Sequence, residues 1–207
     1  MPFVQHASDR RPTDSPATAR LVFEAARRAD AMGILDSADV GHFDAEGARH
    51  VAARARAAGI GRTSAAALAN VESPSAADVQ AMLRTLITAL EQSPVPKFEW
   101  QSVSRVFEAE QLADLLDISV SSLRRYQSGE RETPDDVAAR LHFVALVIGD
   151  LAGAYNEIGI RRWFQRKRTQ LDGRAPAAVL GRNWDPDDPG PQRVRALAAS
   201  LVTLAGA

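Results

Sequence analysis

Residues 110–129 read EQLADLLDISVSSLRRYQSG, and this stretch indicates the fold more clearly than any other part of the chain. A short amphipathic helix from Glu110 to Leu116 is followed by a break at Asp117-Ile118-Ser119. Ser119 is placed to cap a second helix from Val120 to Gln127, because a serine side chain can accept a hydrogen bond from a free N–H at a helix start. Two short helices joined by such a tight turn are the pattern of a helix-turn-helix.

Other residues of this stretch favour the same interpretation. Ala113 is small where the two helices must cross closely, and Gly129 suits the left-handed conformation that often ends a helix. Apolar contacts between the helices are available from Leu112, Leu116, Ile118 and Leu123. The second helix is therefore predicted to enter the major groove of DNA.

The outward side of this second helix carries residue types that read DNA. Arginine can bond guanine through two hydrogen bonds, glutamine can read adenine, and serine can bond bases or phosphates. Arg131 follows the helix and is placed to reach a phosphate. The candidate DNA-binding residues are Ser119, Ser121, Ser122, Arg124, Arg125, Gln127 and Arg131. The alternative is a plain helical hairpin whose adjacent arginines are simply solvated.

The composition of the whole chain limits the classes of protein to which it can belong. Its 207 residues suffice for one large domain or two small ones. The formal net charge is −1, so any affinity for nucleic acid must come from a local patch. The absence of cysteine excludes disulfides, thiolate metal sites and a cysteine nucleophile. No signal-peptide pattern occurs in residues 1–20, and no apolar run approaches the roughly 20 residues that span a bilayer, so a cytoplasmic protein without a membrane partner is expected.

The chain is predicted to be all-α, because helix formers dominate and β-branched runs are few. In the first half, helices are expected from Ser15-Pro16 to about Gly33, from about Asp44 to Gly59, and from Ser75, where Asp78 forms a capping-box-like pair. Residues 1–13 and 59–64 are expected to be loose. In the second half, Thr133 as the cap and Pro134 at the first helical position predict the start of a long helix with apolar residues on one face. Its apolar positions are Val137, Leu141, Val144, Ala145, Ile148, Leu151, Ala152 and Tyr155.

Two prolines in Ser93-Pro94-Val95-Pro96 mark a predicted domain boundary, because they cannot sit inside a helix. This gives a helical N-terminal region of unknown role (1–95), a helix-turn-helix region (96–150) and a small helical C-terminal domain (151–207). Within the last region, short helices are expected at about 159–166 and 176–180. A polar, proline-stiffened loop is expected at 184–191, followed by a final helix to about Leu204.

A basic segment with aromatic residues, 158–180, predicts a binding surface in the C-terminal domain. Arginine and aromatic side chains are the residues that contribute most at interfaces, and a positive surface suits an acidic protein or nucleic acid. The candidate partner-binding residues are Trp163, Phe164, Arg166, Arg168, Arg174 and Trp184. The alternative is that Trp163 and Phe164 are core residues beneath a solvated basic face, and at least one of these rings is expected to be core.

Residues 107–201 together resemble the Xre/MbcA/ParS-type antitoxins, which join an Xre-like helix-turn-helix to a C-terminal toxin-binding domain. The first part of the resemblance lies in Leu112-Ala113, Leu116, Ser119, Leu123-Arg124-Arg125, Gly129 and Pro134. The second part lies in Gly159, Trp163, Leu171, Gly173, Pro176, Leu180, Gly190, Val194 and Leu197. The N-terminal 95 residues lie outside it.

The resemblance implies an antitoxin of a type II toxin–antitoxin system, with a neighbouring NAD-consuming toxin of the RES type. It implies that the C-terminal region blocks the toxin's active site and that the complex represses its own promoter. A homodimer is also expected, because one helix-turn-helix contacts only a half-site of double-stranded DNA. The alternative is a stand-alone helix-turn-helix regulator without a toxin.

An enzyme is not expected, and neither a cofactor nor a metal site. The four histidines, His6, His42, His50 and His142, are scattered without metal-ligand spacing. No glycine-rich phosphate loop or nucleophile elbow occurs. The acidic residues Asp185, Asp187 and Asp188 are interrupted by prolines and a glycine, and an exposed acidic turn accounts for them.

Overall fold

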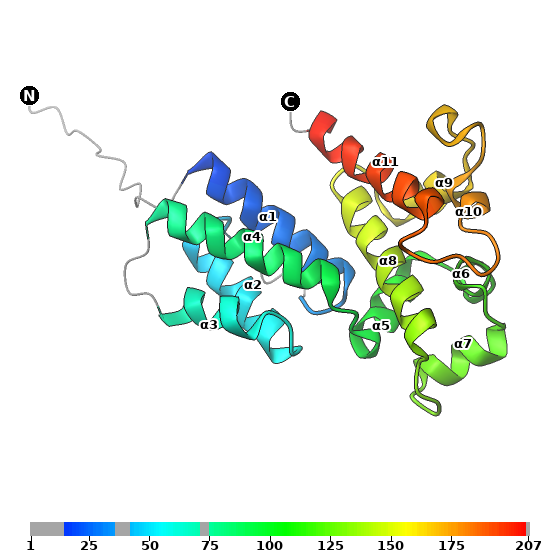
Figure 1. The fold of residues 1–207 in the computed structure, drawn as a ribbon, viewed down its shortest axis with the longest axis horizontal. Coiled ribbons are helices and arrows are strands. Elements are labelled where there is room, and N and C mark those ends of the chain that lie inside the picture. Colours follow the sequence, from blue (N-terminus) through cyan, green and yellow to red (C-terminus); the bar gives the residue numbers. More distant parts are fainter. Residues whose placement is uncertain (1–14, 36–41, 71–74, 206–207) are drawn as a thin grey trace, which may run out of the picture.

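The computed structural model describes residues 15–35, 42–70 and 75–205, and in these residues the chain is all-helical, as predicted (Figure 1). It forms eleven α-helices and a short 3-10 turn, with no strand in the described part of the chain. The expectation for residues 1–13 lies outside the described residues.

The first four helices pack together as an N-terminal bundle. They are α1 (Pro16–Ala31), α2 (Ala45–Ala57), α3 (Arg62–Asn70) and α4 (Ala76–Gln92). The predicted starts are confirmed: Ser15 and Asp44 cap α1 and α2, and Ser75 forms a reciprocal capping box with Asp78 at α4. The expectation that residues 59–64 are loose is wrong, because α3 begins at Arg62.

The predicted break at Ser93-Pro94-Val95-Pro96 is confirmed as a helix boundary. Helix α4 ends at Gln92, and α5 (Pro96–Val106) begins with proline at its first position. Proline is tolerated there because the first helical N–H has no intrahelical partner. The division into domains at this point stays a prediction, since α1 also packs on α8 (Asp135–Ala152) of the second half.

The second half is built around α8. Helices α6 (Ala109–Leu116) and α7 (Val120–Gln127) precede it, and α9 (Glu157–Gln165), the 3-10 turn η2 (Thr169–Leu171), α10 (Pro176–Val179) and α11 (Pro189–Ala205) follow. Helices α1, α5, α6, α9 and α11 all contact α8, so it forms the centre of the fold (Figure 1).

Two sequence expectations for α8 need correction. The helix is buried on every side from Leu141 to Leu151 rather than on one face, because neighbours surround it, while Ala152 and Tyr155 are exposed. Thr133 does not cap the helix. Its hydroxyl accepts a hydrogen bond from Trp100 Nε1 at 3.0 Å, and Pro134 occupies the cap position.

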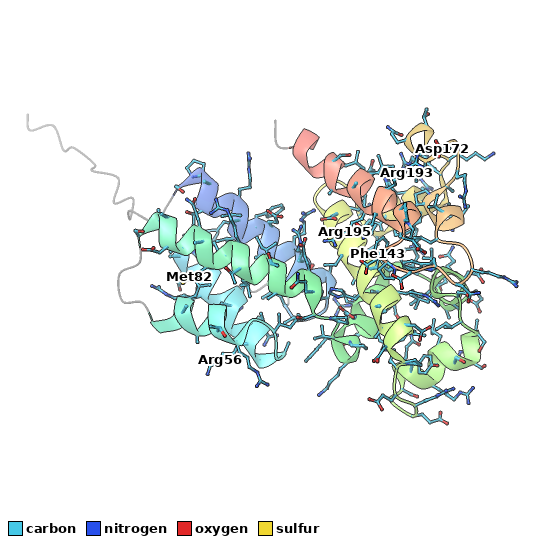
Figure 2. All side chains as sticks on the ribbon, in the orientation of Figure 1. Arg56, Met82, Phe143, Asp172, Arg193 and Arg195 are labelled. Carbon is cyan, nitrogen blue, oxygen red and sulfur yellow. The ribbon has the colours of Figure 1, made fainter. Side chains whose placement is uncertain are left out.

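A buried ionic cluster joins the N-terminal bundle to the second half. Asp150, 2% exposed on α8, lies 3.5 Å from Arg27 and 3.9 Å from Arg28 of α1 and from Arg195 of α11. Glu91 of α4 pairs with Arg28 at 2.9 Å and with Arg195 at 2.7 Å. Figure 2 shows Arg195 at the junction of the two halves. Four helices that are distant in sequence are thereby linked through opposite charges.

No single helix in the described ranges is long and apolar enough to cross a membrane. Helices α8 and α9 meet that test only as a pair, and they are bent by 116° at their junction.

Candidate nucleic-acid interface

The turn between α6 and α7 is closed by a left-handed residue. Asp117 ends α6 with φ +54°, and the N–H of Ile118 donates to the carbonyl of Ala113 at 3.0 Å. Aspartate tolerates this conformation better than most residues. Its carboxylate also accepts a hydrogen bond from the backbone N–H of Asn183 at 2.9 Å. The turn is therefore fixed both within the pair of helices and from the C-terminal half.

The start and the packing of α7 agree with the sequence prediction. Ser119 Oγ accepts a hydrogen bond from the N–H of Ser122 at 3.1 Å, which caps the helix. Leu112, Leu116 and Leu123 are fully buried, and α6 packs on both α7 and α8. Ala113 is also buried, as its small size at the crossing predicts. The α6–α7 unit is thus locked on one side by apolar contacts.

The opposite side of α7 faces solvent. Ser121, Arg124, Arg125 and Gln127 are exposed, whereas Leu123 and Tyr126 are the buried residues of the helix. Arg125 Nε donates to the carbonyl of Ser121 at 3.3 Å. In the described part of the chain, neither Arg124 nor Arg125 forms an ion pair with a carboxylate. Their positive charge is therefore available to a ligand.

Neighbouring segments contact the C-terminal end of this surface. Gln127 Nε2 donates to Ser104 Oγ of α5 at 2.7 Å. The guanidinium of Arg131 lies 5.7 Å from the centre of the Tyr126 ring, which stacks on Trp100. The exposed residues Glu130 and Glu132 flank Arg131 and reduce the positive charge of this loop.

The seven predicted DNA-binding residues thus lie together, but they do not all have free side chains. Ser119 and Ser122 are engaged in the helix cap and are hydrogen-bonded to each other at 3.0 Å. All seven except Ser122 are exposed, and Ser121 Oγ also lies 2.9 Å from Ser119 Oγ. A serine at a predicted cap position already indicates that its hydroxyl is occupied.

The aromatic part of the predicted partner-binding set is wrong. Trp163, Phe164 and Trp184 are 1%, 0% and 4% exposed, so their rings belong to the core and not to a surface. Phe164 packs edge-on against Phe107, with 5.2 Å between the ring centres. Trp184 packs against Phe143, with 5.1 Å between the ring centres. Adjacent residues point to different sides of a helix. Both rings are nevertheless buried, because α5, α8 and α10 pack around α9.

The cationic part of that set stays at the surface. Arg166 and Arg174 are exposed, and Arg174 donates a hydrogen bond to the carbonyl of Ala178. Arg168 is half-buried, with its guanidinium 5.4 Å from the centre of the Trp163 ring. Arginine stacked on an aromatic ring in this way contributes to packing as well as charge.

The C-terminal half is tied to the α6–α7 turn by contacts that sequence reasoning missed. Trp184 Nε1 donates to the carbonyl of Leu115 at 2.9 Å. Arg140 donates from Nε to the carbonyl of Trp184 at 2.9 Å and from Nη1 to that of Leu116 at 3.2 Å. These partners are 24 to 69 positions apart in sequence, and no local pattern announces them.

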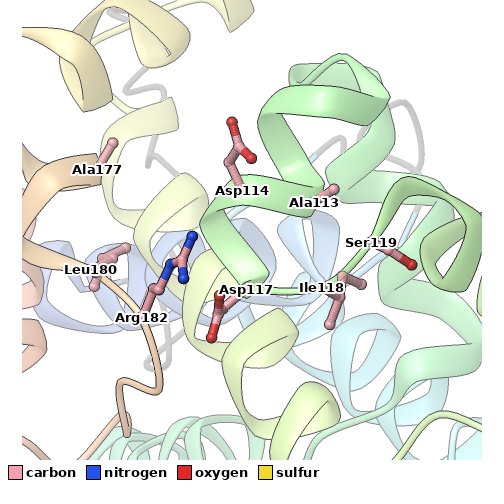
Figure 3. A pocket seen from close by; sticks show the side chains of 9 residues that line it. Ala113, Asp114, Asp117, Ile118, Ser119, Ala177, Leu180 and Arg182 are labelled. Atoms are coloured by element: carbon pink, nitrogen blue, oxygen red, sulfur yellow. The ribbon is translucent and has the colours of Figure 1, made fainter.

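A cavity of about 520 Å³ lies beside these contacts, between the turn and the C-terminal half (Figure 3). Asp114, Asp117 and Ile118 line one side, and Leu180 and Arg182 line the other. In Figure 3 the Arg182 side chain extends toward the carboxylates across the opening. Among the described residues, no group of three or more histidine or acidic side chains has the arrangement of a metal site.

Comparisons with family models, with curated proteins and with solved structures find no match to this chain.

Proposed function

We propose that this chain binds double-stranded DNA through α7. The observation that carries the proposal is the exposed face of α7, where Arg124, Arg125 and Gln127 lie together without an acidic partner in the described residues. Leu123 and Tyr126 fix the other face of the same helix. Exposed arginine and glutamine on a firmly held helix are suited to base edges in the major groove.

We further propose that the protein is a cytoplasmic antitoxin that acts as a homodimer. Its C-terminal half neutralises a NAD-consuming toxin of the RES type, and its DNA-binding helix represses the shared promoter. The support is the resemblance of residues 107–201 to such antitoxins, together with exposed cations at Arg166 and Arg174. Because Trp163 and Phe164 are buried, the interface is assigned to the cations and not to aromatic anchors. A stand-alone regulator without a toxin is the second candidate, since the exposed face of α7 supports it equally.

The DNA-binding proposal is tested by replacing Arg124 and Arg125 with alanine, singly and together. A base-reading arginine is expected to cost about 1–3 kcal/mol of binding free energy and to relax specificity at one base. A phosphate-binding arginine is expected to weaken all sequences alike and to lower the salt slope by about one unit. Binding to the chain's own promoter DNA is measured by fluorescence anisotropy at several salt concentrations.

Arg20→Ala, at an exposed position of α1 outside the predicted DNA-binding set, is the control for the loss of one positive charge. It is expected to bind like the wild type. Unchanged affinity in the Arg124→Ala/Arg125→Ala double variant would show that α7 is not the DNA-binding helix.

The antitoxin proposal is tested with Arg166→Glu/Arg174→Glu. Truncation after Gly181 is unsuitable, because it removes the core residues Trp184, Val194 and Ala198. Charge reversal leaves the core intact and is expected to abolish protection of cells that co-express the neighbouring toxin, while promoter binding is retained. Full protection by this variant would show that these two arginines are not part of the toxin interface. A wild-type chain that neither protects nor binds the toxin would favour the stand-alone regulator.

A further inference from the structure

The N-terminal bundle carries a basic surface that the resemblance does not cover. Arg49, Arg54, Arg56 and Arg62 on α2 and at the start of α3 are all exposed. From residue 47 to residue 70 the chain contains no acidic residue. Asp44 at the cap and Glu46 in the first turn of α2 lie one turn from Arg49, at the opposite end of the helix from Arg56. Arg49 and Arg56 lie seven residues apart and therefore share one face of α2, whereas Arg54 projects from another side of that helix. We name the surface formed by Arg49, Arg56 and Arg62 the α2–α3 basic surface.

The arginines of this surface differ from Arg27 and Arg28 of α1, which form ion pairs. In α1, Arg28 is engaged by Glu24 and Glu91. In contrast, Arg49, Arg56 and Arg62 form no ion pair within the described ranges, and Arg54 donates only to the carbonyl of Ile34 at 3.2 Å. Unpaired arginines clustered on one surface create a positive potential that attracts polyanions.

The α2–α3 basic surface lies on the same edge of the molecule as α7. Figure 1 shows α7 and the C-terminal end of α2 along the lower edge, with α5 between them. Figure 2 shows Arg56 on this edge as well. Lys97, an exposed residue of α5, adds a positive charge to that helix.

We propose that the α2–α3 basic surface binds the phosphate backbone of the same DNA duplex, outside the segment read by α7. The inference rests on the proposed DNA-binding function and gives the N-terminal bundle a role in it. A duplex that follows the lower edge meets α7 at one place and Arg56 at another. Arginines without base-reading neighbours supply affinity that is independent of sequence and sensitive to salt. The surface therefore extends the contacted length of DNA without changing the sequence read.

The test compares two duplexes, one limited to the segment protected around α7 and one extended by about 10 base pairs on each side. Arg56→Ala/Arg62→Ala is expected to bind the long duplex about tenfold more weakly than the wild type and to lower its salt slope by about two units. Binding to the short duplex is expected to be unchanged. Arg20→Ala/Arg84→Ala removes the same charge from exposed positions of α1 and α4, and is expected to bind both duplexes like the wild type.

The outcomes separate this inference from the proposed function. Unchanged binding of the long duplex by Arg56→Ala/Arg62→Ala, with a loss in Arg124→Ala/Arg125→Ala, overturns the inference alone. Equal losses on both duplexes also overturn it, because the arginines then act at the α7 segment or through the fold. Unchanged binding in the α7 variant overturns the proposed function itself. Thermal unfolding of each variant confirms that exposed alanines leave the bundle folded.

Discussion

His142 is held between α4 and α5 by both of its ring nitrogens. Nε2 lies 3.0 Å from the backbone carbonyl of Glu91, and Nδ1 lies 2.6 Å from Glu99 Oε1. A carbonyl oxygen only accepts hydrogen bonds, so Nε2 carries a proton. The short contact at Nδ1 then needs one more proton, which the imidazole and the carboxyl share. The bridge across the Ser93–Pro96 break therefore depends on a buried proton.

Burial raises the pKa of Glu99, which is 0% exposed, although its hydrogen bond with His142 acts in the opposite direction. The folded chain thus holds the proton of Glu99 more tightly than the unfolded chain does. The stability that this proton contributes is fully present below the ordinary glutamate pKa and is lost as the pH rises through the raised pKa. Glu99→Gln keeps an N–H donor toward Nδ1 at every pH.

We therefore expect the advantage of the wild type over Glu99→Gln, in free energy of unfolding, to shrink as the pH rises above the ordinary glutamate value. Denaturant unfolding at a series of pH values measures this difference. Glu110→Gln makes the same substitution at an exposed position of α6, and its difference from the wild type is expected to stay constant. A pH-independent difference for Glu99→Gln would show that the buried carboxyl does not retain its proton.

The sequence predicted the structural role of a residue well where that role depends on a group nearby in the chain. Ser15, Ser75 and Ser119 cap helices as predicted, because a cap needs only a short polar side chain and a free N–H two or three residues later. Asp44 caps the helix that was predicted to begin near it. Trp163 was assigned to a surface because arginines surround it in sequence. Its burial is decided by helices that approach from elsewhere in the chain.

At the scale of elements, the α6–α7 unit was predicted to within one residue at each helix end. Its boundaries follow from a serine cap and a glycine with φ +72°, both of which are local signals. Helices α3 and α5 were missed. The small, alanine-rich α3 has a weak apolar pattern, and α5 begins at the second of two prolines that were interpreted only as a break.

The candidate DNA-binding face was predicted for the same reason, since one amphipathic helix defines both its buried and its exposed residues. The supports of that face were not predictable. Asn183, Trp184 and Arg140 fix the α6–α7 turn through contacts with backbone groups and with Asp117. Such contacts depend on how the C-terminal half packs against α6, which the spacing of residues does not encode.

At the scale of the whole molecule, the two halves share one core and not two. Buried residues of α1 and α4 belong to the same apolar cluster as those of α8, α9 and α11. Gly149 of α8 lies so close to α1 that an added Cβ would approach the Ala31 side chain to 3.1 Å. The ionic cluster around Asp150 adds polar contacts to the same junction. The Ser93–Pro96 break therefore separates two helices without separating two cores.

The position of α8 has a consequence for the exchange of its backbone hydrogens with solvent. Amides of a helix enclosed on every side become accessible only when its neighbours leave, which amounts to unfolding the chain. We expect amides of residues 141–151 to exchange most slowly, with an opening free energy equal to that of global unfolding from denaturant titration. Amides of α7, with only Leu123 and Tyr126 buried, are expected to exchange through smaller openings. Two distinct protection levels within α8 would contradict this. With a single level, hydrogen exchange at the amides of α8 measures the stability of the entire protein.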